Sequence, residues 1–305
     1  MPEQTYDYLI APKASFDATA DAIRAKTGSQ DSITWGQDGF ADAIEAMPSS
    51  SDGAPLDDVC FWDYDGTCIE SYTATEFANL TTLPSNPSHA GLTAQGWNWT
   101  LADAKEFVAE NGFLDIGQLY VTSDDKTHIY VYIREDSKYA TLQLTGSVAG
   151  NLTIDWGDGS ATETNTGTSA TTYTHTYSQL GAYEITIARS SGTLTLNRTT
   201  GNFSIYRRVN IGSNAILVAS TFSQNAELEA VSIPSDCTVA RFTSVGAGVK
   251  CWVFPAAVLS AYTGQLSHSA TKIICFAKQT QTQATAGYEF AQNLGLVRIS
   301  TPIGK

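Results

Sequence analysis

The last third of the chain carries apolar residues at a nearly fixed spacing. Five short apolar pairs, each with one residue between its members, follow one another in this region. The second members of these pairs are Ile211, Ile233, Phe254, Phe276 and Ile299. The steps between them are 22, 21, 22 and 23 residues, and a period of about 20 to 29 residues is typical of solenoid proteins. We therefore expect a solenoid over residues 199–305, in which each turn adds one strand to a ladder.

Alternation between apolar and polar residues predicts strands upstream of these repeats. It occurs in Leu142–Leu144, in Leu152–Ile154 and in Tyr183–Ile187. Gly, Asp and Ser gather between these segments, as they do in turns. Short strands at this spacing indicate a β-sandwich, which we place at residues 138–198.

Two hairpins are predicted within residues 57–137. In the first, Val59–Trp62 and Thr67–Glu70 flank an Asp-Gly turn, which is typical of a tight hairpin. The second would pair residues 118–122 with residues 128–134 across a polar turn. Both hairpins would belong to one small module.

Two helices are expected between these hairpins. Thr73 and Thr100 are good N-cap residues, and each is followed three positions later by an acidic residue. The second helix would end at Asn111-Gly112, because glycine readily adopts the left-handed conformation that closes a helix. The mixture of helices and strands indicates a small α+β module at residues 57–137.

Residues 1–48 predict two short amphipathic helices. Residues 15–28 and 34–47 each have an N-cap signal, and glycine or proline stops each run. Helices this short cannot bury their apolar faces alone, and a polar linker at residues 49–56 separates them from the rest of the chain. We interpret residues 1–48 as a helical segment that docks onto another protein. Its docking candidates are Phe16, Ile23, Trp35, Phe40 and Ile44.

Charge and composition narrow the range of partners. The 305 residues include 17 Lys or Arg and 31 Asp or Glu, which gives a net charge of −14. The basic residues form no cluster along the sequence that could neutralise the phosphates of a nucleic acid. Nucleic acid is therefore not expected as a partner. Charged residues make up only 16% of the chain, which favours β-structure with neutral polar surfaces. The N-terminus does not have the pattern of a signal peptide, and no apolar stretch approaches the roughly 20 residues that span a bilayer.

Few residues have the spacing of a ligand site, and we expect neither a metal nor a cofactor. Cys60 and Cys68 could be bridged across the first hairpin, although both also suit buried apolar positions. Asp155 and Asp158 could coordinate a calcium ion, but they supply fewer oxygen ligands than the roughly six to eight that calcium requires. The aromatic pair in Trp97-Asn98-Trp99 could stack on a sugar, but packing in a core is favoured.

Residues 61–67, with the sequence FWDYDGT, resemble the signature of haloacid-dehalogenase-like phosphatases. The resemblance implies Asp63 as the nucleophile that becomes phosphorylated and Asp65 as the acid/base. That family needs a doubly wound parallel sheet with helices between successive strands. The stretch of chain between the linker and the sandwich is too short for the usual set, and the predicted hairpin conflicts with it.

Three segments, taken in order, resemble a polycystic kidney disease (PKD) domain. They are residues 153–160 with a WGDGS turn, residues 173–177 with an HTY motif, and residues 181–187 with the sequence GAYEITI. That family has an immunoglobulin-like sandwich, and its members usually act as spacers or binding modules. The resemblance covers about a fifth of the chain.

Residues 221–234 resemble a unit of the BspA-like leucine-rich repeats, whose pattern is roughly AFxxCxxLxxVxIP, and residues 252–255 keep the end of that pattern. The order of helical head, small module, PKD-like sandwich and BspA-like repeats is similar to that of proteins encoded by phages and prophages of gut Firmicutes. Many of these are taken to be virion structural or host-attachment proteins.

These resemblances imply a non-enzymatic phage virion structural protein on the particle surface, of tail-fibre, receptor-binding or head-decoration type. Residues 1–48 would anchor it to capsid or tail proteins, and its C-terminal modules would bind a host surface glycan or protein, as part of a homo-oligomer. Assembly in the host cytoplasm would need no signal peptide, and no membrane contact is expected. The alternatives are a bacterial cell-surface adhesin and a phosphatase that uses Asp63 and Asp65.

Overall fold

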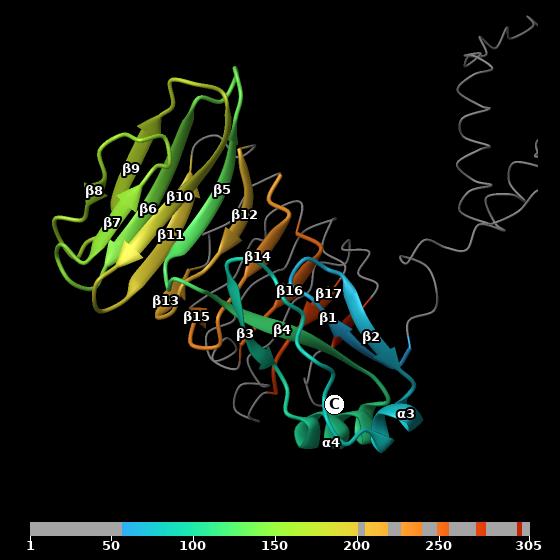
Figure 1. Cartoon of the computed structure of the whole chain (residues 1–305). Coiled ribbons are helices and arrows are strands. Elements are labelled where there is room, and N and C mark those ends of the chain that lie inside the picture. The colour runs from blue at the N-terminus through green and yellow to red at the C-terminus, as the bar shows by residue number, and fades with distance from the viewer. Residues whose placement is uncertain are drawn as a thin grey trace, which may run out of the picture. The chain divides into compact units, whose positions relative to one another are not determined.

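The computed structural model describes residues 57–200, 205–218, 227–239, 249–255, 273–278 and 298–300. All of them belong to the second of the two units into which the chain divides, Asp57–Lys305 (Figure 1). The two helices and the five docking candidates predicted in residues 1–48 lie outside the described residues. The docking role therefore stays a prediction.

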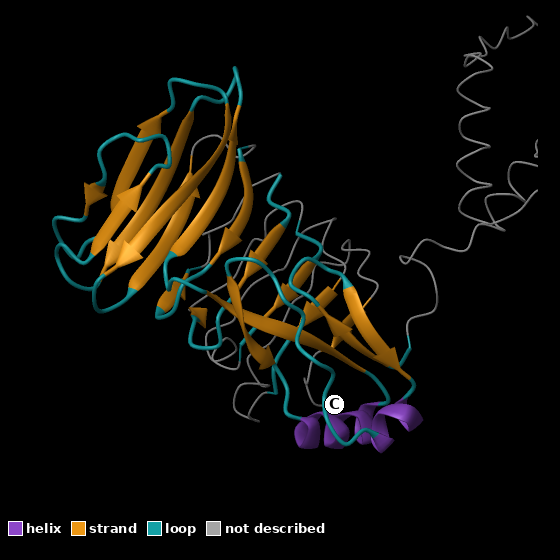
Figure 2. Ribbon diagram, in the orientation of Figure 1, coloured by secondary structure: helices purple, strands orange, loops and turns teal. Residues whose placement is uncertain are grey.

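Strands dominate the described part of the chain, as the alternation and the composition predict, and form four sheets, none of which is closed (Figure 2). The first sheet has the order β2-β1-β4-β3. Its strands are β1 (Val59–Trp62), β2 (Cys68–Tyr72), β3 (Leu92–Trp97) and β4 (Leu114–Thr122). Helices α3 (Ala74–Asn79) and α4 (Leu101–Asn111) pack their buried side chains against β1 and β4.

The first hairpin and both helices of the small module form where the sequence predicts them. Strands β1 and β2 are antiparallel around the Asp-Gly turn. Thr73 caps α3 in a complete capping box with Glu76, and the Thr100 side chain caps α4. Helix α4 ends at Gly112, whose φ of 83° is the left-handed conformation expected of a closing glycine.

Two larger sheets follow and share one hydrophobic core. Their orders are β14-β12-β5-β10-β7-β8 and β15-β13-β11-β6-β9. The strands are β5 (Thr127–Ile133), β6 (Tyr139–Gly146), β7 (Leu152–Asp155), β8 (Glu163–Thr164), β9 (Thr171–Thr176), β10 (Gly181–Arg189), β11 (Leu194–Thr200), β12 (Tyr206–Asn210), β13 (Ala215–Leu217), β14 (Ala230–Ser232) and β15 (Thr238–Val239). The alternating segments predicted at residues 142–144, 152–154 and 183–187 all lie in these strands.

The second predicted hairpin is wrong. Strand β5 does not pair with β4; it lies between β10 and β12 and is antiparallel to both. Its alternate residues Ile129, Val131 and Ile133 are buried in the core between the two larger sheets, so core packing outweighs the short turn that links β4 to β5. Residues 127–133, which we placed with the α+β module, therefore belong to a sheet of the next region.

The five periodic apolar pairs all lie in or beside short strands that pair in parallel. Strand β12 pairs with β14 in the six-stranded sheet, whereas β16 (Cys251–Val253), β17 (Ile273–Cys275) and β18 (Arg298–Ser300) form a separate three-stranded sheet in that order. Val209 is in register with Val231, and Trp252 with Ile274, both at a step that the sequence predicts. Ile274 is in register with Ile299, so the last step is two positions longer than the predicted one.

A second parallel ladder, which the sequence did not suggest, runs beside the first. Ile216 of β13 is in register with Thr238 of β15, at the same step as Val209 and Val231, and β13 also pairs in parallel with β11. Each of these two turns of chain therefore adds one strand to each of the two larger sheets. The repeats continue the sheets of the preceding region and do not begin a separate sheet there.

The first sheet packs directly on the repeat strands. The Asn98 side chain donates hydrogen bonds to the carbonyl oxygens of Phe254 (3.2 Å) and Cys275 (3.0 Å), and accepts one from the Gly117 N–H. The Trp99 indole donates to the Phe276 carbonyl oxygen at 2.6 Å. Residues 98 and 99 thus donate hydrogen bonds to carbonyl oxygens of two successive repeats. The small module and these repeats are therefore in direct contact.

Candidate functional site

The Asp63 carboxylate, the sharpest candidate from the sequence, is closed off by its neighbours. Its side chain is only 3% exposed. His89 Nε2 lies 2.6 Å from Oδ2, while the Tyr120 hydroxyl and the Tyr64 backbone N–H donate to Oδ1 at 3.0 and 2.8 Å. The rings of Tyr64, His89 and Tyr120 pack edge to face around it. Burial, and then the nearby Asp63 carboxylate, raise the pKa of Tyr120, which keeps its hydroxyl a donor.

This geometry does not support a phosphorylated nucleophile at Asp63. Both carboxylate oxygens accept hydrogen bonds, whereas a nucleophile needs an oxygen that substrate can reach. Asp65 is exposed, and its Oδ1 accepts the Thr67 N–H at 2.9 Å as part of the turn. Strand β1, which leads into Asp63, has one antiparallel and one parallel neighbour, so its sheet is not doubly wound.

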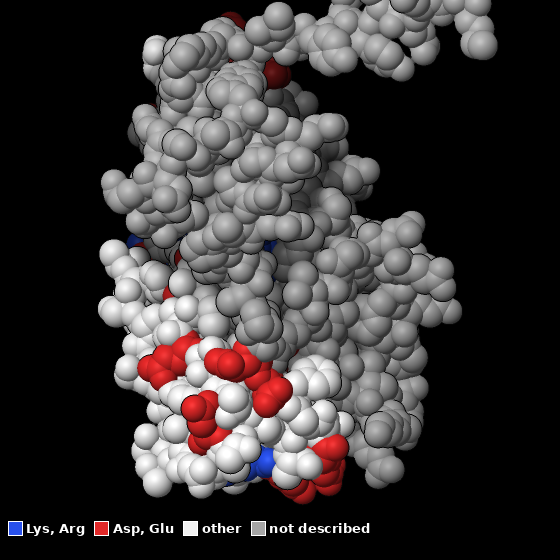
Figure 3. Space-filling view, turned by 90° about the vertical axis from the view of Figure 1, so that its right-hand side faces the viewer, with Lys and Arg blue, Asp and Glu red and all other residues white. Residues whose placement is uncertain are grey.

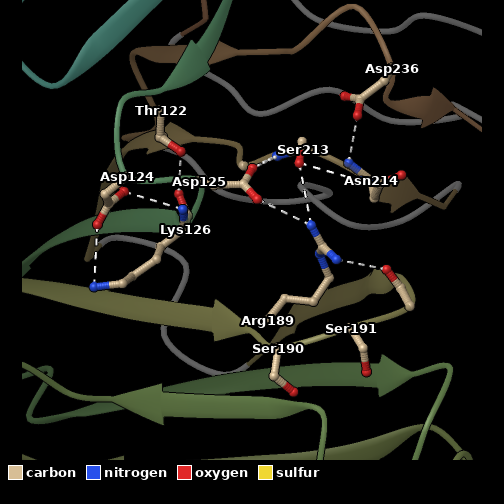
Figure 4. A network of polar contacts seen from close by, with 12 residues as sticks. Thr122, Asp124, Asp125, Lys126, Arg189, Ser190, Ser191, Ser213, Asn214 and Asp236 are labelled. Atoms are coloured by element: carbon tan, nitrogen blue, oxygen red, sulfur yellow. Dashed lines mark hydrogen bonds and ion pairs between the residues drawn. The ribbon is translucent and has the colours of Figure 1, made fainter.

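The acidic pair after β4 forms a polar clamp between loops (Figure 4). Asp125 Oδ2 lies 3.2 Å from Arg189 Nη2, and Asp125 Oδ1 accepts the Ser213 N–H at 3.0 Å. Asn214, in the same loop as Ser213, donates its N–H to Asp236 Oδ2 at 2.9 Å. The clamp joins the turn between β4 and β5 to the turns that lead into β11, β13 and β15. Its carboxylates therefore have a structural use.

The WGDGS segment forms a second structural cluster. Asp158 Oδ2 lies 2.8 Å from His175 Nε2, and the Trp156 ring stacks on His175 with centroids 5.1 Å apart. The Tyr177 hydroxyl donates to the Trp156 carbonyl oxygen at 3.1 Å. Gly157 has a φ of 78°, and a side chain there would collide with the backbone of β10. The motif residues that suggested calcium or a PKD domain thus fix the loop between β7 and β8.

The remaining sequence candidates lie in cores. Trp99 is buried, and Trp97 packs against the same cluster with its indole donating to the Pro84 carbonyl oxygen at 2.9 Å. Both rings pack in this core, so the favoured interpretation as core residues is confirmed. No disulfide joins Cys60 to Cys68. Among the described residues, no three His, Cys, Asp or Glu side chains are arranged to hold a metal ion.

An outward surface of the six-stranded sheet offers a different kind of site. We define the tyrosine–arginine face as His128, Tyr130 and Tyr132 of β5 with Arg207 and Arg208 of β12. The β5 residues of this face alternate with the buried core positions of the strand, so their side chains lie on the opposite side of the sheet. A β-bulge between Tyr206 and Arg208 lets Arg207 and Arg208 both reach this surface.

Charges and rings alternate across this face. The Arg208 guanidinium lies 4.3 Å from the centroid of the Tyr130 ring, and that of Arg207 lies 6.0 Å from the centroid of the Tyr132 ring. His128 Nδ1 lies 2.5 Å from Glu184 Oε1 on the neighbouring strand β10. Burial, and then the Glu184 carboxylate, raise the pKa of Tyr130.

The arginine end of the face holds an ordered ion-pair network. Arg134 Nη2 lies 2.8 Å from Glu227 Oε1, and Arg207 Nη1 pairs with Glu227 Oε2. Tyr132 beside it is 46% exposed, one of the most exposed large apolar side chains in the described part of the chain. An exposed ring next to fixed charged groups can stack on a ligand and hydrogen-bond to it at once.

Charge is distributed unevenly between the regions. Residues 57–122 contain ten Asp or Glu against one Lys, a net charge of −9 out of the −14 of the whole chain. Figure 3, which turns the side with β2 and α3 toward the viewer, shows acidic side chains dominating the described surface there. The three arginines around Tyr130 and Tyr132 are accompanied by the carboxylates of Glu184 and Glu227, so these charged groups sum to +1 on a strongly acidic protein.

We did not predict this face from the sequence, although a signal was present. The segment His128-Ile-Tyr130-Val-Tyr132-Ile alternates strictly, and its outward positions are aromatic where most strands of this chain place Thr, Ser or Gln. The pair Arg207-Arg208 stands out in a chain with few basic residues. The sequence could not show that β5 and β12 are neighbours, because strands β6 to β11 lie between them along the chain.

No described helix is long and apolar enough to cross a bilayer. No protein family model matches the chain, and neither the curated proteins nor the solved structures include a significant match to it.

Proposed function

We propose that this chain is a non-enzymatic structural protein displayed on the surface of a phage particle, as a tail-fibre, receptor-binding or head-decoration component. Residues 1–48 would anchor it to capsid or tail proteins, and the region from residue 127 onward would contact the host surface. In this proposal the two larger sheets form a PKD-like sandwich, and the parallel ladders form a BspA-like repeat solenoid.

The observation that carries the proposal is the continuity of the sheets. Strands β12 and β14 extend the six-stranded sheet, β13 and β15 extend the five-stranded sheet, and both pairs have the same step along the chain. One hydrophobic core runs through both regions and reaches Trp252, Phe254, Ile274 and Phe276. Shared strands and a shared core suit a rigid display protein better than a string of flexible domains.

The tyrosine–arginine face supplies a contact surface for such a protein. Tyr and Arg are enriched at the energetically important positions of binding interfaces. Each copy would bind weakly through one small patch, and several copies on one particle would raise the overall affinity through avidity. A homo-oligomer would raise the overall affinity in the same way.

Mass spectrometry and cryo-electron microscopy of purified particles test this proposal. The particles come from a phage or induced prophage whose genome encodes the chain. We expect the chain in stoichiometric amounts, with residues 1–48 against capsid or tail and the tyrosine–arginine face exposed. Absence of the chain from the particles would contradict the proposal and favour the alternative of a bacterial cell-surface adhesin.

A further inference from the structure

We infer that the arginine end of the tyrosine–arginine face is a subsite for an acidic saccharide, with the Tyr132 ring as its stacking platform and Arg134, Arg207 and Glu227 as its polar rim. The inference rests on the proposed function, because it names the class of surface ligand that the displayed protein would bind.

The platform is open on the side of the neighbouring strand. Tyr132 is in register with Ala182 of β10, and both side chains lie on the outer side of the sheet. Neighbouring side chains on adjacent strands are roughly 5 Å apart, so the small Ala182 side chain leaves space beside the ring. A pyranose ring can occupy that space and place the C–H groups of one face on the tyrosine ring.

The rim is ordered before any ligand arrives. The two oxygens of Glu227 hold Arg134 and Arg207 in place from one side. Because a guanidinium carries five N–H groups, Arg207 has more donors than a single carboxylate oxygen can accept. Groups fixed in this way lose little side-chain entropy on binding, which favours a ligand with several hydroxyl or carboxylate oxygens.

The charge of the rim selects the kind of saccharide. Two guanidinium groups and one carboxylate give a net charge of +1 at neutral pH, and guanidinium groups bind carboxylates through paired hydrogen bonds. A uronic acid or another carboxylated sugar therefore complements the rim better than a neutral sugar.

The surroundings argue against a protein partner at this point. Five large apolar side chains are exposed in the described part of the chain, and each comes from a different strand or loop. They are Phe113, Tyr132, Tyr139, Val148 and Leu180. A ring flanked on one side by the charged groups of Arg134, Arg207 and Glu227 offers less apolar area than the core of a protein interface has, but enough for one sugar ring.

A printed array of bacterial capsular and cell-wall polysaccharides, with and without uronic acids, tests the inference on the full-length chain. The best-bound polysaccharide is then titrated by calorimetry against single variants. We expect Tyr132→Ala to weaken binding at least tenfold and Arg207→Gln to weaken it several-fold, with binding of the wild type falling as salt rises. Tyr132→Phe should keep most of the affinity, because the stacking ring remains.

Tyr139→Ala is the matched control, because Tyr139 is 41% exposed on β6 and lies outside the rim. It should bind like the wild type. Equal binding by Tyr132→Ala and the wild type, a preference for neutral polysaccharides, or no binding to any member of the array would each overturn the subsite. If the chain is found in particles but binds no saccharide, the display proposal survives and only the subsite fails. Saccharide binding without presence in particles would instead favour the adhesin.

Discussion

Asp63 and the tyrosine–arginine face combine the same kinds of side chain with opposite results. At Asp63, a carboxylate, a histidine and two tyrosines are packed together until the carboxylate is 3% exposed and both of its oxygens are engaged. On the tyrosine–arginine face, tyrosines, arginines and carboxylates also contact one another, but Tyr132 remains 46% exposed. The motif that resembles a catalytic signature is therefore buried with both carboxylate oxygens engaged, while a strand without any such motif exposes a large ring beside charged groups.

The comparison predicts that the closed centre supports stability and the open face does not. Replacing Asp63 by Ala removes the acceptor of His89, Tyr120 and the Tyr64 N–H, which leaves donors buried without their partner. Leaving a buried donor without its partner costs about 1 to 3 kcal/mol, and because three donors lose their acceptor we expect Asp63→Ala to lower the free energy of unfolding by about 3 kcal/mol. Urea unfolding followed by tryptophan fluorescence measures it.

Asp65→Ala is the control for this change, because Asp65 is exposed and two residues away. We expect a loss below about 1 kcal/mol, typical of a turn hydrogen bond. The alternative hypothesis of Asp63 as a nucleophile makes a separate prediction. Hydrolysis of p-nitrophenyl phosphate by the wild type that disappears in Asp63→Asn would reverse our assignment of the centre.

The tight contact between β4 and the repeat strands should also support stability. A Cβ atom at Gly117 would lie 2.9 Å from Cys275 Cβ and closer still to the methyl groups of Val253. Overpacking of this kind costs about 1 to 3 kcal/mol, so Gly117→Ala should destabilise the protein by that amount. Gly167→Ala should change stability by less than about 0.5 kcal/mol, because a Cβ at Gly167 has open space around it. Equal effects of the two substitutions would show that β4 does not pack on the repeats in solution.

We expect an intermediate effect on stability in the WGDGS loop, where the side chains of Asp158 and His175 are partly exposed. The Ser160 hydroxyl, the His175 ring and the Ser160 N–H bind the Asp158 carboxylate and lower its pKa to about 2. A carboxyl group whose pKa is lowered in the folded state stabilises the fold above its unfolded pKa of roughly 4, and this contribution disappears as the pH falls toward about 2.

The Asp158→Asn variant should therefore lose part of the pH dependence of unfolding between about pH 4 and pH 2, measured as urea midpoints across that range. Glu110→Gln, a change at an exposed carboxylate of α4, should keep the pH dependence of the wild type. Parallel curves for the wild type and Asp158→Asn would mean that the hydrogen bonds of Asp158 with Ser160 and His175 do not stabilise the folded state.

The smallest effect on stability should come from the open face. Tyr132→Ala removes an exposed ring and should change the free energy of unfolding by no more than about 0.5 kcal/mol, as should Tyr139→Ala. Differential scanning calorimetry of both variants measures this. A large loss in Tyr132→Ala would mean that the ring supports the fold, and would remove the contrast with Asp63.

Local signals in the sequence were sufficient for elements that depend on neighbouring residues. The caps of α3 and α4 form at Thr73 and Thr100 because their side chains reach backbone groups within three residues. The β1–β2 hairpin and the short strands of the repeats form for similar reasons, since alternation and turn residues act over a few positions. The hairpin of residues 118–134 was wrong because its short turn was the only local signal, and the distant strands β10 and β12 offered β5 a larger core.

Alternation, turn residues and periodicity were enough to predict that the chain is mainly β, where most strands lie, and that five short apolar pairs recur at a nearly constant step. They did not reveal which strands are neighbours, that Asp63 is buried with both oxygens bound, or that Tyr132 lies beside Arg207. The physical reason is that periodicity fixes which face of a strand is buried, while pairing between strands far apart in the chain depends on the packing of the whole core.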